Sequence, residues 1–395
     1  MDNLTTDTVL DCTHLSVQQD GEEFTVGDPA TGEFIRVPEV AVDVVRGFDG
    51  EKTIAEVKQE VEAKYGEDVD VLDFAETLIE MELVLKINGE VINEEIEREV
   101  NPKLQKLGSF FYNPVAVGFY GLATVSAIIL FLVQPQLFPT FRDVFLFESV
   151  GLSSLIILFT MAVLTIVHEI GHALAASRLG IKTKIQLNLR MVFLVAETDM
   201  SGLWSRERKE RYLPYFAGMA WDGAILFFCL IIQILFPVAS VMAIGQMITF
   251  FILYNILGQF IFFLRTDVYF IITNWVNTSA LHQHSIIFLQ NLFLKRNQDE
   301  WSRLAAHEQK HAKWFSGLYT VGGALAIFLF GYFQIPPVVY MIQQAYGHLT
   351  TEAVTNAYFW DGVIVIGVLA IQVLLWLFGL RTAMRERQAS QAVSA

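Results

Sequence analysis

The chain has 395 residues, of which 53% are hydrophobic and only 17% are charged. Because soluble domains carry about 25% charged residues, this composition excludes a purely soluble protein and predicts membrane spans. The net charge of −15 is unevenly distributed: residues 1–100 hold a net −20 and the remaining residues a net +5, so an acidic soluble domain precedes a hydrophobic body.

Residues 1–100 are expected to form a small cytoplasmic α+β domain with a winged-helix-like fold. A strand-like segment at 22–37 is followed by helical patterns at 38–48, 53–66 and 69–87. The net charge of −20 would repel a phosphate backbone, so no nucleic-acid partner is expected. The first residues lack a basic stretch followed by an apolar run, so we expect no cleavable signal sequence.

Residues 101–395 are expected to form a mainly α, polytopic membrane bundle of about six transmembrane helices, with a core at 150–280. A bilayer requires roughly 20 apolar residues per helix. Six stretches meet this length, at 114–133, 150–176, 213–236, 238–264, 314–333 and 358–380. Nineteen Lys and Arg residues lie on one side of this topology and only Arg142 lies on the other. Since basic residues mark cytoplasmic loops, both termini are predicted to face the cytoplasm.

The second predicted span carries a candidate metal site near its cytoplasmic end. His168 and His172 are four residues apart, so on a helix they share one face and can reach the same Zn²⁺. Glu169 adjoins the first histidine, where its carboxylate can act as the general base for an attacking water. Ionisable groups inside an apolar span cost about 2.5–3.5 kcal/mol, so they are functional candidates. The alternative is that the histidines form hydrogen bonds between neighbouring helices.

The segment after this span, 182–199, is expected to lie beside the membrane as one or two strands. Its residues are β-branched and partly alternate between apolar and polar types. An exposed edge of such a strand could hold an extended peptide substrate by strand addition.

A catalytic zinc site needs a third protein ligand, and three aspartates adjoin the spans. Asp222 lies about nine residues into the third span, at the same depth as His168 and His172. Asp267 lies at the cytoplasmic end of the fourth span, and Asp361 lies at the outer end of the sixth, too far away. Depth alone slightly favours Asp222, whose other possible role is to orient a ligand histidine by a hydrogen bond.

A second HExxH pattern occurs at His307, Glu308 and His311, before the fifth span. It lies in a polar cytoplasmic segment, so we expect a solvated helical turn with a structural role. The nearby His282 and His284 leave an accessory metal site as the alternative.

Several motifs resemble those of site-2-protease-like intramembrane metalloproteases. "HEIGHALAASRLG" is similar to their HExGHxxxA signature, "YFAGMAWDGAI" to their AGPxxN/D helix, and "LRTDVYFIITNW" to the segment that supplies their third ligand. The resemblance implies that His168, His172 and Asp267 are zinc ligands and that Glu169 is the general base. Residues 10–90, through "YGEDVDVLDFAETLIEMELV", resemble PqqD-like peptide-recognition domains. Relatives of this combined type are bacterial membrane proteins, which implies a location in the cell membrane.

Two residues depart from the family pattern. Met219 replaces a proline after the Ala–Gly pair, and Val268 stands where the family has glycine after the ligand aspartate. Valine cannot adopt the backbone conformations that are open to glycine, so the ligand loop is expected to differ in shape.

The sequence therefore predicts an intramembrane zinc endopeptidase that cleaves a membrane-associated or small ribosomal peptide near the cytoplasmic leaflet. The alternative is a non-catalytic membrane adaptor, export or immunity component that retains a structural metal site. The sequence leaves the substrate and the oligomeric state open.

Overall fold

The computed structural model describes residues 4–21, 23–93, 100–190, 193–278 and 280–393. The chain divides into two compact units. The first unit comprises Met1–Phe110, Ala173–Lys184 and Asp199–Pro214, and the second comprises Phe111–His172, Ile185–Thr198 and Tyr215–Ala395. The domain boundary near residue 100 stays a prediction, and the first unit also takes in two later segments of the chain.

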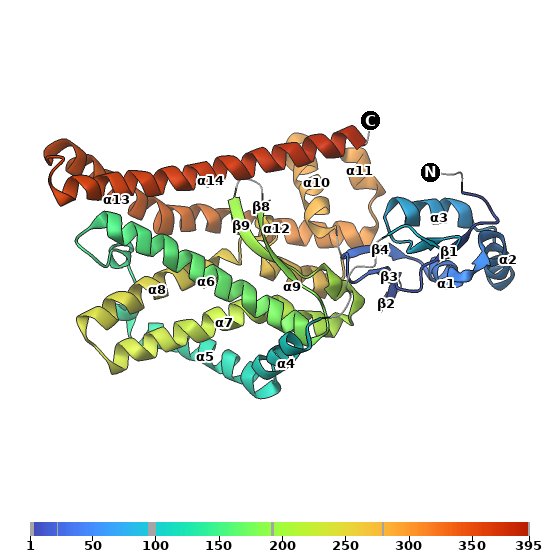
Figure 1. The fold of residues 1–395 in the computed structure, drawn as a ribbon, viewed down its shortest axis with the longest axis horizontal. Coiled ribbons are helices and arrows are strands. Elements are labelled where there is room, and N and C mark those ends of the chain that lie inside the picture. Colours follow the sequence, from blue (N-terminus) through green and yellow to red (C-terminus); the bar gives the residue numbers. More distant parts are fainter. Residues whose placement is uncertain (1–3, 22, 94–99, 191–192, 279, 394–395) are drawn as a thin grey trace. The chain divides into compact units, whose positions relative to one another are not determined.

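The N-terminal part of the first unit combines short strands with three helices (Figure 1). Its helices are α1 (Glu39–Gly47), α2 (Ile54–Tyr65) and α3 (Val71–Glu80). One sheet has the order β2 (Ser16–Asp20), β3 (Glu23–Asp28), β4 (Glu33–Val37). The other has the order β5 (Asp49–Thr53), β1 (Val9–Asp11), β6 (Lys86–Ile87), β7 (Glu90–Val91).

Local signals set the ends of these helices. Thr53 and Glu56 form a reciprocal capping box at the start of α2, and Gly66 ends it in a left-handed conformation with φ of 73°. The prediction that the third helix extends to residue 87 was wrong, because α3 ends at Glu80. Glu82 then takes a positive φ of 57°, and the chain turns so that Leu83 enters the apolar core before β6 begins.

Six helical segments among the described residues are long and apolar enough to cross a membrane, as predicted. They are α5 (Pro114–Val133), α6 (Val150–Arg178), α7 (Arg208–Leu235), α8 (Ala239–Gly258), the α12–α13 segment (Ala306–Thr351) and α14 (Ala357–Val393). Length and composition establish this property, which is what a membrane protein needs.

Three of the six segments differ from their predicted bounds by more than five residues, and one of these is α14, which ends at Val393 instead of residue 380. The fourth was predicted to reach residue 264, but α8 ends at Gly258 and a 3-10 turn, η4 (Phe262–Leu264), follows. The fifth continues beyond its "QIPP" stretch, an extension that the sequence left open, because a π-helical turn (η5, Phe330–Gln334) joins α12 (Ala306–Leu329) to α13 (Ile335–Thr351). The two prolines of this stretch lie just after the π-helical turn.

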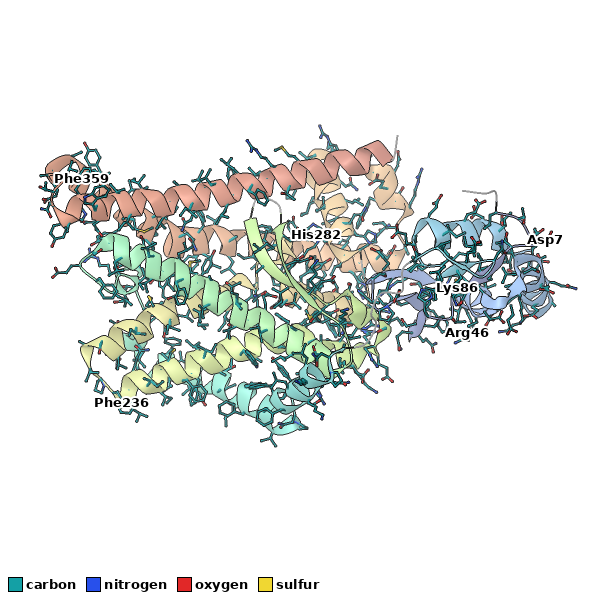
Figure 2. The ribbon with its side chains drawn as sticks, viewed as in Figure 1. Asp7, Arg46, Lys86, Phe236, His282 and Phe359 are labelled. Atoms are coloured by element: carbon teal, nitrogen blue, oxygen red, sulfur yellow. The ribbon has the colours of Figure 1, made fainter. Side chains whose placement is uncertain are left out.

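The helix that carries the HExxH motif lies in a shared apolar core. Ile157 and Leu164 of α6 pack with Leu230 of α7 and Phe250 of α8, and Figure 1 shows these three helices together. Phe236, after α7, and Phe359, near the start of α14, lie at the same end of the second unit, away from His282 on α10 (Figure 2).

The remaining elements connect or flank these helices. The predicted strands are present as a two-stranded sheet of β8 (Lys184–Arg190) and β9 (Phe193–Asp199), with Met191 and Val192 outside the described residues. The other elements are α4 (Pro102–Phe111), η1 (Pro135–Leu137), η2 (Phe141–Val144), η3 (Ser201–Ser205), α9 (Asp267–Val276), α10 (Leu281–Leu294) and α11 (Gln298–Arg303).

Candidate metal centre

The HExxH motif lies on α6 with its three polar side chains out of solvent. His168 is 5% exposed, Glu169 is 7% exposed and His172 is 1% exposed. The four-residue spacing places the two imidazoles on one face of the helix, as expected. Their rings meet edge to face, with the centroids 4.8 Å apart.

Asp267 completes a triangle with the two histidines. Its Oδ2 lies 3.0 Å from Nε2 of His168 and 3.1 Å from Nε2 of His172, and the two Nε2 atoms are 3.1 Å apart. Within the part of the chain that the structure describes, only these three residues bring three metal-binding atoms within 4.8 Å of one another. The aspartate favoured by the family resemblance therefore lies beside both rings.

Asp222 lies behind His168 instead of beside both rings. Its Oδ2 is 2.8 Å from Nδ1 of His168, and the residue is fully buried on α7. A carboxylate accepts a hydrogen bond from the ring N–H, which places the proton on Nδ1 and leaves the lone pair of Nε2 facing His172 and Asp267. This is the orienting role that the sequence left open for Asp222.

The residues present fit a zinc ion. Two imidazole nitrogens and one carboxylate oxygen are a known ligand set of catalytic zinc. Ligands bound at about 2.0–2.2 Å to a tetrahedral ion lie about 3.3 Å apart, close to the 3.0–3.1 Å edges of this triangle. The lone pairs of the three atoms converge, and such mutual repulsion is relieved when a divalent cation binds to all three.

The backbone that follows Asp267 is helical. Asp267 is the first residue of α9, so Val268 has a helical backbone, which valine tolerates. The residue with positive φ is Arg265, at 53°, two positions before the aspartate.

Gln259 is a site residue that the sequence reasoning missed. Its Oε1 accepts a hydrogen bond of 3.0 Å from the backbone N–H of Asp267, and its Nε2 lies 3.4 Å from Nε2 of His168. The side chain therefore fixes the start of α9 relative to the triangle. The available signal was an amide side chain inside the predicted span 238–264, eight positions before Asp267.

Gly218 of α7 is the second missed residue. A Cβ atom at this position would lie 2.4 Å from Nε2 of His172 and 2.5 Å from Nε2 of His168. No side chain fits there, so only glycine allows α7 to pass this close to both rings. The residue lies in the "AG" pair of the family-like motif, which was the available signal.

Glu169 contacts a side chain of β9. The hydroxyl of Thr198 lies 2.7 Å from Oε2 of Glu169 and 3.0 Å from its backbone carbonyl oxygen. Thr198 is 8% exposed, so this contact is shielded from solvent. The sequence placed Thr198 in a strand but not beside the glutamate.

The second HExxH pattern has a structural explanation. Oε2 of Glu308 accepts a 3.1 Å hydrogen bond from the backbone N–H of Ala305 at the start of α12, which caps the helix. His307 is exposed, and Oε1 of Glu308 is 3.9 Å from Nδ1 of His284. This geometry agrees with the expected structural role.

Asp361 caps the N-terminal end of α6, opposite the end that carries the HExxH motif. Its carboxylate accepts hydrogen bonds from the backbone N–H groups of Val150 (3.2 Å) and Gly151 (2.8 Å) and from the Ser149 hydroxyl. These contacts satisfy N–H groups at the first turn of the helix that carries the HExxH motif.

Comparisons of the chain with family models, with curated proteins and with solved structures found no match.

Proposed function

We propose that the protein is an intramembrane zinc-dependent endopeptidase that hydrolyses a peptide bond of a membrane-associated or small ribosomal peptide. The observation that carries this proposal is the triangle of buried His168, buried His172 and half-buried Asp267, with Glu169 buried on the helix of the two histidines. Such groups are costly inside an apolar helix, and here they converge on one point instead of pairing singly.

The chain's own residues would divide the chemistry as follows. His168, His172 and Asp267 would hold the zinc, which when bound polarises the scissile carbonyl and makes water a better nucleophile near neutral pH. Glu169 takes a proton from the water as the water oxygen attacks the carbonyl carbon. As the C–N bond breaks, Glu169 delivers that proton to the leaving amine nitrogen, and the products are a carboxylic acid and an amine, which ionise to a carboxylate and an ammonium group.

The positioning residues support the same proposal. Asp222 fixes the ring of His168, and Gln259 fixes the backbone of Asp267. Partners of this kind hold a ligand in its tautomer and orientation, and their loss costs about 10- to 100-fold in metal affinity. The resemblance to site-2-protease-like metalloproteases, carried by three motifs between residues 150 and 280, adds to this geometry.

The N-terminal domain would deliver or gate the substrate. Helices α1, α2 and α3 followed by the β6–β7 pair are in the order expected of a winged-helix-like fold, which supports the PqqD-like resemblance. Its net charge of −20 would repel the phosphate backbone of a nucleic acid, so a nucleic-acid partner is not expected. A peptide, such as a leader segment of a ribosomal product, is the partner we infer.

The reaction would take place near the cytoplasmic leaflet of a bacterial cell membrane, with both termini in the cytoplasm. The basic residues on one side of the topology support this orientation. The β8–β9 sheet has only two strands, so its outer edges could pair with an extended substrate. Ile185 and Leu187 on β8 are exposed, which suits an apolar peptide.

The test uses the full-length protein, purified in detergent with zinc, and a panel of fluorescence-quenched apolar peptides of about 20 residues, long enough to span a bilayer. We expect wild-type protein to cleave members of the panel and Glu169→Gln to lose at least about 100-fold in rate while keeping its zinc. His168→Ala should lose both zinc and cleavage. The matched control is Glu308→Gln in the second HExxH pattern, which should cleave as wild type does.

A non-catalytic adaptor would give a different result. It would retain zinc through His168 and His172 but show no cleavage that depends on Glu169. Equal rates for wild type and Glu169→Gln would therefore rule out the protease and favour the adaptor with a structural metal.

A further inference from the structure

Thr198 joins the candidate general base to a strand that lies outside α6. Its side chain reaches Glu169 from β9, 29 residues further along the chain, with Oγ1 2.7 Å from Oε2 and 3.0 Å from the backbone carbonyl oxygen. Both residues are buried, at 8% and 7% exposure. A hydrogen bond in such surroundings is stronger than an exposed one, because the local dielectric constant is low.

We propose that Thr198 is a positioning residue that holds the carboxylate of Glu169 in the orientation required for proton transfer. This inference rests on the proposed function, since it assigns a partner to the base of that reaction. The hydroxyl donates to Oε2, which fixes the carboxylate plane and leaves Oε1 as the oxygen that accepts the proton from water. A freely rotating carboxylate would spend less time in reach of that proton.

The two acceptors around the hydroxyl suit both protonation states of the base. When Glu169 is ionised, the Thr198 O–H donates to Oε2 at 2.7 Å. When Glu169 carries the proton, the same O–H can turn to the carbonyl oxygen at 3.0 Å and leave its own lone pairs free for a carboxyl O–H. The hydroxyl therefore keeps a donor or an acceptor beside the carboxyl group throughout the proton transfer.

The pairing of β9 with β8 helps to hold Thr198 in place beside Glu169. Asn188 of β8 donates a 2.8 Å hydrogen bond to Glu197, which ties the two strands together one residue before Thr198. A side chain on a paired strand is held more firmly than one on a free loop. The strand pair proposed to hold the substrate thus also holds the base.

The test compares Thr198→Val, which loses the hydroxyl at nearly constant shape, with Thr198→Ser, which keeps it. Rates are measured on the peptide panel used for the proposed function, with the zinc content of each protein determined in parallel. We expect Thr198→Val to lose about 10- to 100-fold in kcat with KM and zinc content unchanged. Thr198→Ser should stay within about threefold of wild type, because its hydroxyl can form the same bond.

The matched control is Thr320→Val on α12, whose hydroxyl bonds only to the carbonyl of Ser316 in its own helix. It should cleave as wild type does. A wild-type kcat in Thr198→Val, or an equal loss in both Thr198 variants, would overturn the inference and leave Thr198 a packing residue. Equal cleavage by wild type and Glu169→Gln would instead remove the proposed function, and this inference with it.

Discussion

At the scale of single residues, Gly218 decides how closely α7 can approach the imidazoles of the metal centre. The absent Cβ leaves room for the facing Nε2 atoms of His168 and His172, at distances where no carbon atom could stay. The same helix carries Asp222, four residues later, whose carboxylate contacts the other nitrogen of His168. One turn of α7 therefore shapes both sides of that ring.

We expect Gly218→Ala to lose zinc. The added methyl group would overlap both ring nitrogens. An extra carbon in a packed site costs typically about 1–3 kcal/mol, and here the two imidazoles would have to move out of the positions in which they face Asp267. Zinc per protein after dialysis is the measurement. The control is Gly121→Ala on α5, where a Cβ meets nothing within 4 Å. Full zinc content in Gly218→Ala would contradict this account.

At the scale of elements, a buried ion pair holds the β2–β3–β4 sheet of the first unit to the start of α7. Nη2 of Arg211 donates a 2.7 Å hydrogen bond to Oδ2 of Asp20, and Arg211 is fully buried. The guanidinium also lies 4.7 Å from the ring centre of Trp204 on η3. The Thr25 hydroxyl donates to the same aspartate oxygen at 3.1 Å, so two donors contact Oδ2 of Asp20.

We expect Arg211→Met to destabilise the first unit by about 3–5 kcal/mol, because it leaves the buried charge of Asp20 without its partner. The double variant Asp20→Asn, Arg211→Met should lose less than Arg211→Met alone. Hydrogen exchange of the amides in β2, β3 and β4 of the full-length protein is the measurement. Lys209→Met, which removes an exposed partner of Glu207, should not change exchange. Equal protection in wild type and Arg211→Met would show that the pair contributes little.

A pH dependence is expected within the same unit. Asp43 on α1 accepts hydrogen bonds from Lys64 and from the Tyr65 hydroxyl (2.7 Å), and these partners lower its pKa from the ordinary value of 3.8. A depressed pKa stabilises the folded state above the ordinary value, and this contribution is lost as the pH falls through the lowered pKa. The protection factors of the α1 and α2 amides against hydrogen exchange should therefore fall below about pH 4 in wild type. Asp43→Asn should lack this step, and an identical profile in both proteins would contradict the assignment.

At the scale of the whole molecule, the candidate metal centre brings together elements that are distant in sequence. His168 and His172 come from α6, Asp222 from α7 and Asp267 from α9. A ligand that binds only the folded state stabilises it, by about 2.7 kcal/mol at a free concentration one hundred times its Kd. Bound zinc would therefore stabilise the packing of these helices as well as the site.

Removal of the metal should accordingly lower the thermal unfolding midpoint of the second unit. We expect a chelator to shift the midpoint of wild-type protein downward and to leave that of His168→Ala unchanged, since this variant lacks a ligand. Differential scanning fluorimetry in detergent measures both. Re-addition of zinc should restore the wild-type midpoint only. A midpoint that does not depend on zinc in either protein would show that the site has no such role.

The sequence by itself determined the features that depend on local patterns. Six apolar segments, the strand pair at 182–199 and the shared face of His168 and His172 follow from hydropathy, alternation and the helical repeat, which act over a few turns of chain. Helix ends were less predictable: residues 81–87 keep a helical pattern, but burial of Leu83 in the core ended α3 at Glu80.

Only the tertiary structure shows that Asp267 lies beside both imidazoles and that Asp222 lies behind one of them. Depth slightly favoured Asp222, but depth does not determine which nitrogen of an imidazole a carboxylate will meet. The same holds for Gly218, Gln259 and Thr198, whose positions beside the site depend on how α7, α9 and β9 pack against α6. The physical reason is that the packing of these elements sets contacts between residues about 30 to 100 positions apart. A local sequence pattern does not specify such contacts.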